Sequence, residues 1–174
     1  IAKEVTPALL AQVAEAHKRG RRLFIATTNL DAQRGVVWNM GAIATRGDEA
    51  ALKLFRDIML ASTAIPGLFP PALIDVEANG KANKEMHADG GLAAQVYTAP
   101  ESMLNASSSY KLPATELYVV ANTGLTPEFQ MSERSLLGVL GRSISVGVRI
   151  MLRLGVDRAY AAAKRSDIPF NLAY

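Results

Sequence analysis

Cysteine is absent from the 174 residues, and histidine occurs only twice. The lack of thiols excludes disulfide bonds and thiolate catalysis, and together with the shortage of histidine it disfavours a structural zinc site. No apolar run approaches the roughly 20 residues that a membrane-spanning helix needs, and the first residues do not resemble a signal peptide. These absences leave the compartment open between the cytosol, the periplasm, a lipoprotein anchor and a peripheral position on a membrane.

Aromatic residues are also scarce, at 6% of the chain, and they are not interleaved with the basic residues. A nucleic-acid platform combines both kinds of side chain, so this separation argues against one. The net charge of +3 is concentrated in residues 131–165, where seven basic and two acidic residues give +5 and leave −2 for the remainder. No glycine-rich phosphate loop occurs, and we expect neither an organic cofactor nor a metal ion.

The chain does contain an alternation of helical and strand patterns. Hydrophobic residues make up 49% and charged residues 20%, as in an ordinary globular protein. Capping residues and helical spacing predict helices over residues 6–20 and 49–61, and one or two helices over 133–165. Apolar runs predict strands at 22–29, 36–43, 72–77, 85–88 and 116–122. The alternation indicates a single α/β domain over residues 1–174 with a partly parallel sheet.

The most informative short motif is Asp89-Gly90-Gly91, which directly follows a predicted strand. An acidic residue in this position presents its carboxylate at the end of the strand, and the glycines leave bare backbone beside it for a substrate. The alternative is an ordinary turn in which the aspartate side chain bonds its own backbone. The local pattern leaves both interpretations open.

A second segment, residues 61–71, reads Ala-Ser-Thr-Ala-Ile-Pro-Gly-Leu-Phe-Pro-Pro. Together with the Asp-Gly-Gly motif it resembles the patatin-like phospholipases and lipolytic acyl hydrolases, and residues 21–92 carry most of the resemblance. The resemblance implies a three-layer α/β sandwich with a central, mostly parallel sheet. It also implies that this chain is the later portion of that domain, incomplete on its N-terminal side.

The resemblance assigns roles to individual residues. It implies hydrolysis of a lipid acyl ester by a Ser-Asp dyad without a cofactor, in which Asp89 takes the serine proton as general base and Gly90 and Gly91 support the motif. Five residues of the 61–71 segment are implied to shape the lipid cleft: Ser62, Ile65, Pro66, Phe69 and Pro70. A carboxylate that accepts the proton directly makes a catalytic histidine unnecessary.

The serine of that dyad has no candidate in the sequence. Ser143 and Ser145 each lack one of the two glycines of a Gly-x-Ser-x-Gly elbow, and both fall in a helical pattern, where we interpret them as small residues at a packing contact. In the family the elbow and a glycine-rich oxyanion loop lie upstream of the segments seen here. We therefore expect the 174-residue chain alone to be inactive, with the serine supplied by a missing segment or a second chain.

The two histidines allow several interpretations. His17 falls near the end of the first predicted helix, where an imidazolium suits the helix dipole, so we expect it on the solvated surface. His87 lies two residues before Asp89 and therefore on the same face of the strand. It is either a partly buried strand residue, which we favour, or a residue of the same cleft.

The basic segment has two interpretations as well. Arg142, Arg149 and Arg153 share one helix face, with apolar residues around them. The face belongs either to an interfacial helix in peripheral contact with anionic lipid or to a core-packed helix with solvated arginines. For the whole chain, the alternatives to an enzyme are a non-catalytic lipid- or membrane-binding module on a patatin-like scaffold and a generic α/β binding domain.

Overall fold

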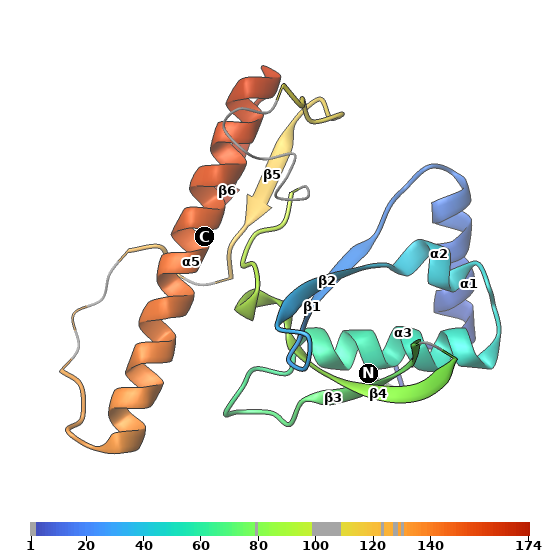
Figure 1. Ribbon diagram of the computed structural model, residues 1–174. Helices are drawn as coiled ribbons and strands as arrows, with labels where there is room; N and C mark the ends of the chain where they lie inside the picture. Colours follow the sequence, from blue (N-terminus) through green and yellow to red (C-terminus); the bar gives the residue numbers. More distant parts are fainter. Residues whose placement is uncertain (1–2, 79, 99–108, 123, 127–128, 130) are drawn as a thin grey trace. The chain divides into compact units, whose positions relative to one another are not determined.

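The computed structural model describes residues 3–78, 80–98, 109–122, 124–126, 129 and 131–174. The chain is mixed α/β and divides into two compact units, Ile1–Ala93 and Ala94–Tyr174 (Figure 1). The interpretation of residues 1–174 as one patatin-like domain stays a prediction. Residues 102–113, whose sequence is typical of a loop, lie mostly outside the described residues.

The first unit contains three helices and four strands among the described residues. They are α1 (Pro7–Lys18), β1 (Phe24–Asn29), β2 (Arg34–Asn39), α2 (Met40–Ala44), α3 (Glu49–Ser62), β3 (Ala72–Ala78), β4 (Lys81–Asp89) and the 3-10 turn η1 (Gly90–Leu92). The helix boundaries follow from their caps: the side chains of Thr6 and Asp48 accept hydrogen bonds from the backbone of α1 and α3. Gly20, with a φ of 94°, ends α1 as predicted.

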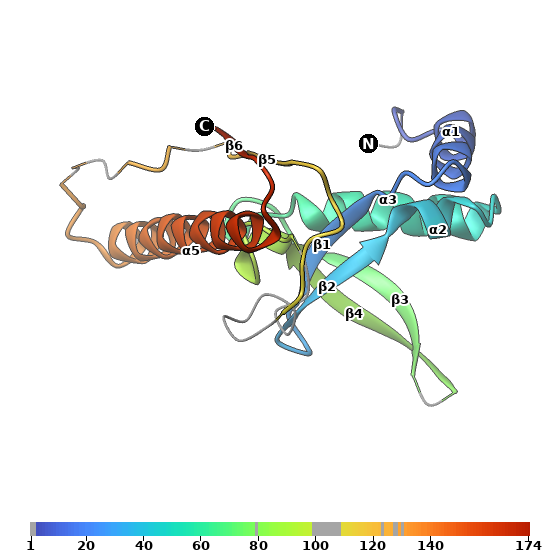
Figure 2. The same ribbon diagram turned by 90° about the horizontal axis from the view of Figure 1, so that it is seen from above.

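The four strands form one sheet in the order β2-β1-β4-β3, and every neighbouring pair is antiparallel. The prediction of a central, mostly parallel sheet is not confirmed. The short turns between β1 and β2 and between β3 and β4 leave no room for a crossover, so those pairs can only be antiparallel. β4 pairs with β1 only over its last three residues, and Figure 2 shows the β3–β4 hairpin running out to its turn beyond β1 and β2.

The predicted strand over 36–43 is wrong in its second half. β2 ends at Asn39, whose side chain accepts a hydrogen bond from the backbone of Ala42 and caps α2. The apolar run continues through this boundary, and a short buried helix and a buried strand cannot be separated by such a run alone.

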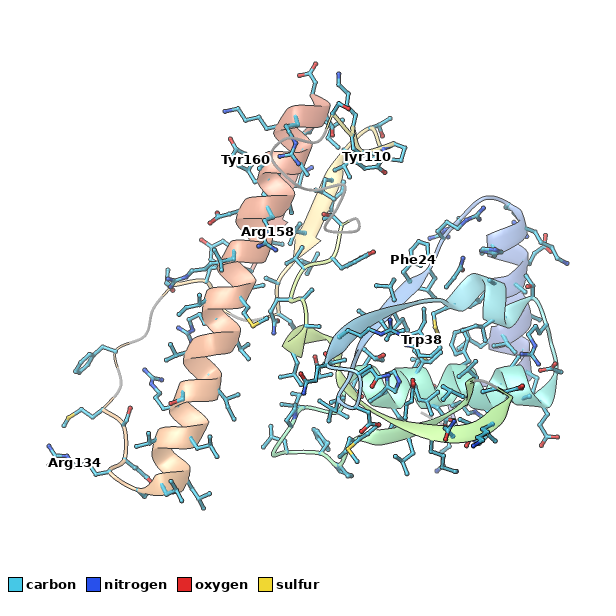
Figure 3. The ribbon with its side chains drawn as sticks, viewed as in Figure 1. Phe24, Trp38, Tyr110, Arg134, Arg158 and Tyr160 are labelled. Atoms are coloured by element: carbon cyan, nitrogen blue, oxygen red, sulfur yellow. The ribbon has the colours of Figure 1, made fainter. Side chains whose placement is uncertain are left out.

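The core of the first unit lies between the sheet and the helices. Phe55 and Ile58 of α3 pack with Ile74 of β3 and Met40 of α2, and Trp38 packs partly buried against them (Figure 3). All four of the fully buried residues named here are at most 2% exposed. This packing covers one face of the sheet and holds the end of α3 over the end of β4.

Among its described residues, the second unit contains β5 (Leu117–Val120), α5 (Leu136–Ser166) and β6 (Phe170–Ala173). α5 is one continuous helix of 31 residues despite its four glycines, which settles the choice between one helix and two. β5 and β6 pair in parallel, and Val119 packs against Leu152, Val156 and Ala159 of α5. No helix in the described parts of the chain is long and apolar enough to cross a membrane.

Candidate functional site

Asp89 lies at the end of β4, where the strand passes into η1. Its Oδ1 accepts a hydrogen bond of 2.7 Å from the backbone N–H of Gly91, and its own carbonyl oxygen accepts one of 2.8 Å from the Thr28 hydroxyl. The side chain is half-buried. The carboxylate is therefore fixed in orientation by its own turn, which is the ordinary Asp-Gly turn that the sequence allowed as an alternative. The same geometry is compatible with a role as general base.

The surroundings of Gly90 explain why this motif needs glycine at that position. The residue is buried, and a Cβ atom built on it would collide with the carbonyl oxygen of Ala26 in β1. Only a glycine lets the chain turn this closely against the neighbouring strand. The close approach fixes the backbone next to Asp89.

The 61–71 segment comes directly against Asp89. The Asp89 backbone N–H donates to the carbonyl oxygen of Ala64 over 3.0 Å. Around this contact the turn after α3 exposes Ile65, Leu68 and Phe69, the last at 58%. A fixed carboxylate and an exposed apolar turn therefore meet at one end of the sheet.

The remaining residues of this segment differ in their surroundings. Pro66 is half-buried and Pro70 is exposed. Ser62 is half-buried, and its hydroxyl donates to the Met59 carbonyl inside α3. The cleft-shaping roles of these residues stay predictions.

A polar network that the sequence did not predict lies next to Asp89, with residues from β1, β2 and β4. His87 is fully buried, and its Nδ1 lies 2.9 Å from the hydroxyl oxygen of Thr27. The Trp38 indole N–H donates to the same oxygen over 2.8 Å. In the β1–β4 register Thr27 stands opposite Asp89. The alternation of each strand was the only sequence signal, because it places Thr27, His87 and Asp89 on matching faces once the pairing is known.

The hydrogen bonds are compatible with a neutral His87 that carries its ring proton on Nε2. Because the Thr27 oxygen accepts from Trp38, its hydrogen can be donated to His87 Nδ1, and the ring proton then belongs on Nε2. That nitrogen has no hydrogen-bond partner among the described residues and lies 3.6 Å from Glu85 Oε2, which accepts a bond from Asn29. Burial lowers the pKa of His87 below its ordinary 6.5, and the Glu85 carboxylate opposes that shift only in part.

We expect the first unit to lose stability as the pH falls below 6.5. The pKa of His87 is lower in the folded state, so the unfolded chain binds the proton more tightly and protonation favours unfolding. Urea unfolding followed by the fluorescence of Trp38, the one tryptophan, measures this loss between about pH 7.5 and about pH 5. One proton contributes a slope of at most about 1.4 kcal/mol per pH unit.

Two variants isolate this histidine. His87→Gln removes the titrating group, so the stability of that variant should depend less on pH. Glu85→Gln removes the charge that raises the pKa of His87, so the loss should extend to lower pH. An unchanged pH dependence in His87→Gln would show that other groups cause the loss.

The other candidates of the sequence analysis lie elsewhere. The His17 ring packs against Gly41 of α2, and its Nδ1 is buried, so the expectation of a solvated His17 is wrong. Gly41 lacks the side chain that would exclude the ring. Ser143 and Ser145 are exposed in the middle of α5 and not at a packing contact, and the Ser143 hydroxyl donates to the Val139 carbonyl.

Two of the three arginines predicted as a cationic face hold the chain that precedes α5. Arg149 donates to the Thr126 carbonyl over 2.5 Å, and Arg153 donates to the Leu125 carbonyl over 2.7 Å. Both side chains, like that of Arg142, are half-buried. These bonds favour a structural role for Arg149 and Arg153.

Among the described residues no three histidine, aspartate or glutamate side chains gather in a way that could hold a metal ion. No family model, no curated protein and no solved structure matches the chain. Function can therefore be inferred only from the site itself, and the patatin-like relationship stays a prediction.

Proposed function

We propose that this chain carries the general-base half of a lipid acyl hydrolase, a phospholipase A-like serine esterase with a Ser-Asp dyad. The observation that carries the proposal is the Asp89 carboxylate, which its turn orients at the end of β4 beside an exposed apolar turn. No described residue bonds its second oxygen, Oδ2, so one acceptor can face a substrate or nucleophile. Carboxylates activate hydroxyl nucleophiles in this way.

The reaction places one proton on Asp89 for a time. A serine hydroxyl attacks the acyl carbonyl carbon, its proton passes to the carboxylate, and the proton then leaves with the departing alcohol. Water would release the acyl group by the same route, with backbone N–H groups holding the oxyanion. Ser62 is the one serine of residues 1–93, and its hydroxyl is bonded inside α3. No serine of residues 94–174 stands in a Gly-x-Ser-x-Gly elbow, so the proposal takes the nucleophile from a segment or chain outside these 174 residues.

The apolar turn supports a lipid substrate. Ile65, Leu68 and Phe69 are exposed within a few residues of the Ala64 carbonyl that bonds Asp89. Exposed apolar side chains beside a polar site suit an acyl chain whose ester group must reach the carboxylate. The lipid headgroup and the chain length stay open.

The patatin-like three-layer sandwich is part of the same proposal. α3 and the sheet whose face it covers would be two of the three layers. A mostly parallel central sheet would need strands beyond the four antiparallel ones described here.

A non-catalytic lipid-binding module is the second candidate. It is favoured by one observation, namely that Ser62, the one serine of residues 1–93, has its hydroxyl bonded inside α3 and not presented to Asp89.

The test compares two forms of the protein with a fluorogenic medium-chain acyl ester. The 174-residue chain alone should show no turnover, whereas the full natural polypeptide, or this chain with the chain that supplies the serine, should hydrolyse the ester. Turnover by the isolated chain would contradict an external nucleophile. A folded full polypeptide without turnover would favour the binding module.

A further inference from the structure

The first half of α5 is apolar and exposed, whereas its second half forms the core of the second unit. All buried residues of the helix lie at Leu152 or beyond. Before that point large apolar side chains face solvent, and Leu136 reaches 85% exposure. The exposed set, called here the apolar face of α5, is Leu136, Leu137, Val139, Leu140, Ile144, Val146 and Ile150.

The charges along this half are all of one sign. No acidic residue lies between Glu133 and Asp157, while Arg134 and Arg142 are both basic. Arg134 is exposed and points away from α5 in the view of Figure 3. At 100° per residue Arg142 falls on the same narrow stripe as Arg149 and Arg153, and the apolar face occupies most of the remaining circumference.

This combination fits one kind of partner. A broad apolar face edged by arginines alone matches a lipid surface, which is apolar below the headgroups and negatively charged at them. A second copy of the same face would bring like charges together without a carboxylate to pair them. Charge complementarity therefore favours an anionic membrane over self-association.

We propose that the first half of α5 is an interfacial helix, which inserts its apolar face into an anionic lipid surface while Arg134 and Arg142 contact the headgroups. Arg149 and Arg153 hold residues 125–126 against the helix and so mark where the inserted half ends. The proposal is independent of ester hydrolysis, because binding to a membrane requires no turnover.

Co-sedimentation with vesicles tests this. The full chain should bind vesicles of phosphatidylcholine with phosphatidylglycerol and bind phosphatidylcholine alone about tenfold less. Leu140→Glu should lower binding to the anionic vesicles about tenfold, because it puts a charge in the middle of the apolar face. Arg134→Gln should lower it about fivefold by removing one headgroup contact.

Leu73→Glu is the matched control, since Leu73 on β3 is 50% exposed and Leu140 is 54% exposed. It adds the same charge elsewhere and should leave binding within about twofold of the original. Circular dichroism checks that each variant stays folded. The proposal would be overturned if Leu140→Glu and Leu73→Glu lowered binding equally, or if the chain bound neutral and anionic vesicles equally well. It would also be overturned if the chain bound neither kind of vesicle. A dimer in solution that Leu140→Glu dissociates would overturn it as well.

Discussion

Asp89→Asn should remove ester hydrolysis by the complete enzyme, lowering kcat/KM by about 10²–10⁴-fold, the usual contribution of a general base. The amide oxygen of asparagine can still accept the Gly91 N–H bond that orients Asp89 Oδ1. It cannot take the serine proton. The variant therefore tests the chemistry of the group while keeping its shape, and initial rates on a medium-chain acyl ester measure the loss.

Asp75→Asn provides the matched control on the neighbouring hairpin strand. Asp75 is exposed on β3 and pairs with Lys53 and Lys84 at 3.0 and 3.1 Å, so the same substitution there removes only surface ion pairs. Its activity should stay within about twofold of the original. If Asp89→Asn kept full activity, Asp89 would be a turn residue only. If neither the original nor the variants turned over substrate while folded, the binding module would be the better account.

The helix boundaries were predictable because the signals that set them are local. Thr6 and Asp48 each bond a backbone N–H three residues ahead, and Gly20 adopts a positive φ just after α1. Such contacts depend only on neighbouring residues. The end of β2 was missed because the Asn39 cap is hidden within an apolar run, where helix and strand look alike.

Strand pairing was not predictable, and the site shows the consequence. The sequence predicted functional roles for Asp89 and for residues 61–71. The backbone hydrogen bond between Asp89 and Ala64 brings the two together. The sequence did not indicate that His87 would bond Thr27, which lies 60 residues away. Contacts of that range depend on the register of β1 with β4, and the alternation of each strand is compatible with several registers and partners.

The turn at Asp89 is part of the same hydrogen-bonded structure as the polar network of His87, Thr27 and Trp38. Thr27 lies opposite Asp89, and its neighbour Thr28 donates to the Asp89 carbonyl. The buried bonds therefore lock β4 against β1 at the residue where the carboxylate leaves the sheet. A rigid position of this kind suits the proposed role of Asp89 as general base for an external serine.

Gly90→Ala should destabilise the first unit strongly for so small a substitution, costing about 1–3 kcal/mol of unfolding free energy or more. The new methyl group would strike the Ala26 carbonyl, which is backbone of a central strand. That strand is bonded to β2 on one side and β4 on the other, so it cannot move aside without breaking its register. Urea unfolding followed by Trp38 fluorescence measures the cost.

Gly35→Ala separates this close approach from the general effect of adding a methyl group. The nearest atom to a Cβ on Gly35 is the Ala93 methyl carbon at 3.1 Å, a small side chain that a slight shift can relieve. We expect a clearly smaller loss of stability there, with hydrolysis by the complete enzyme retained. In Gly90→Ala hydrolysis should fall further than the folded fraction does, because any relief of the clash moves Asp89. Equal losses in both variants would mean that the approach of Gly90 to β1 does not hold the carboxylate in place.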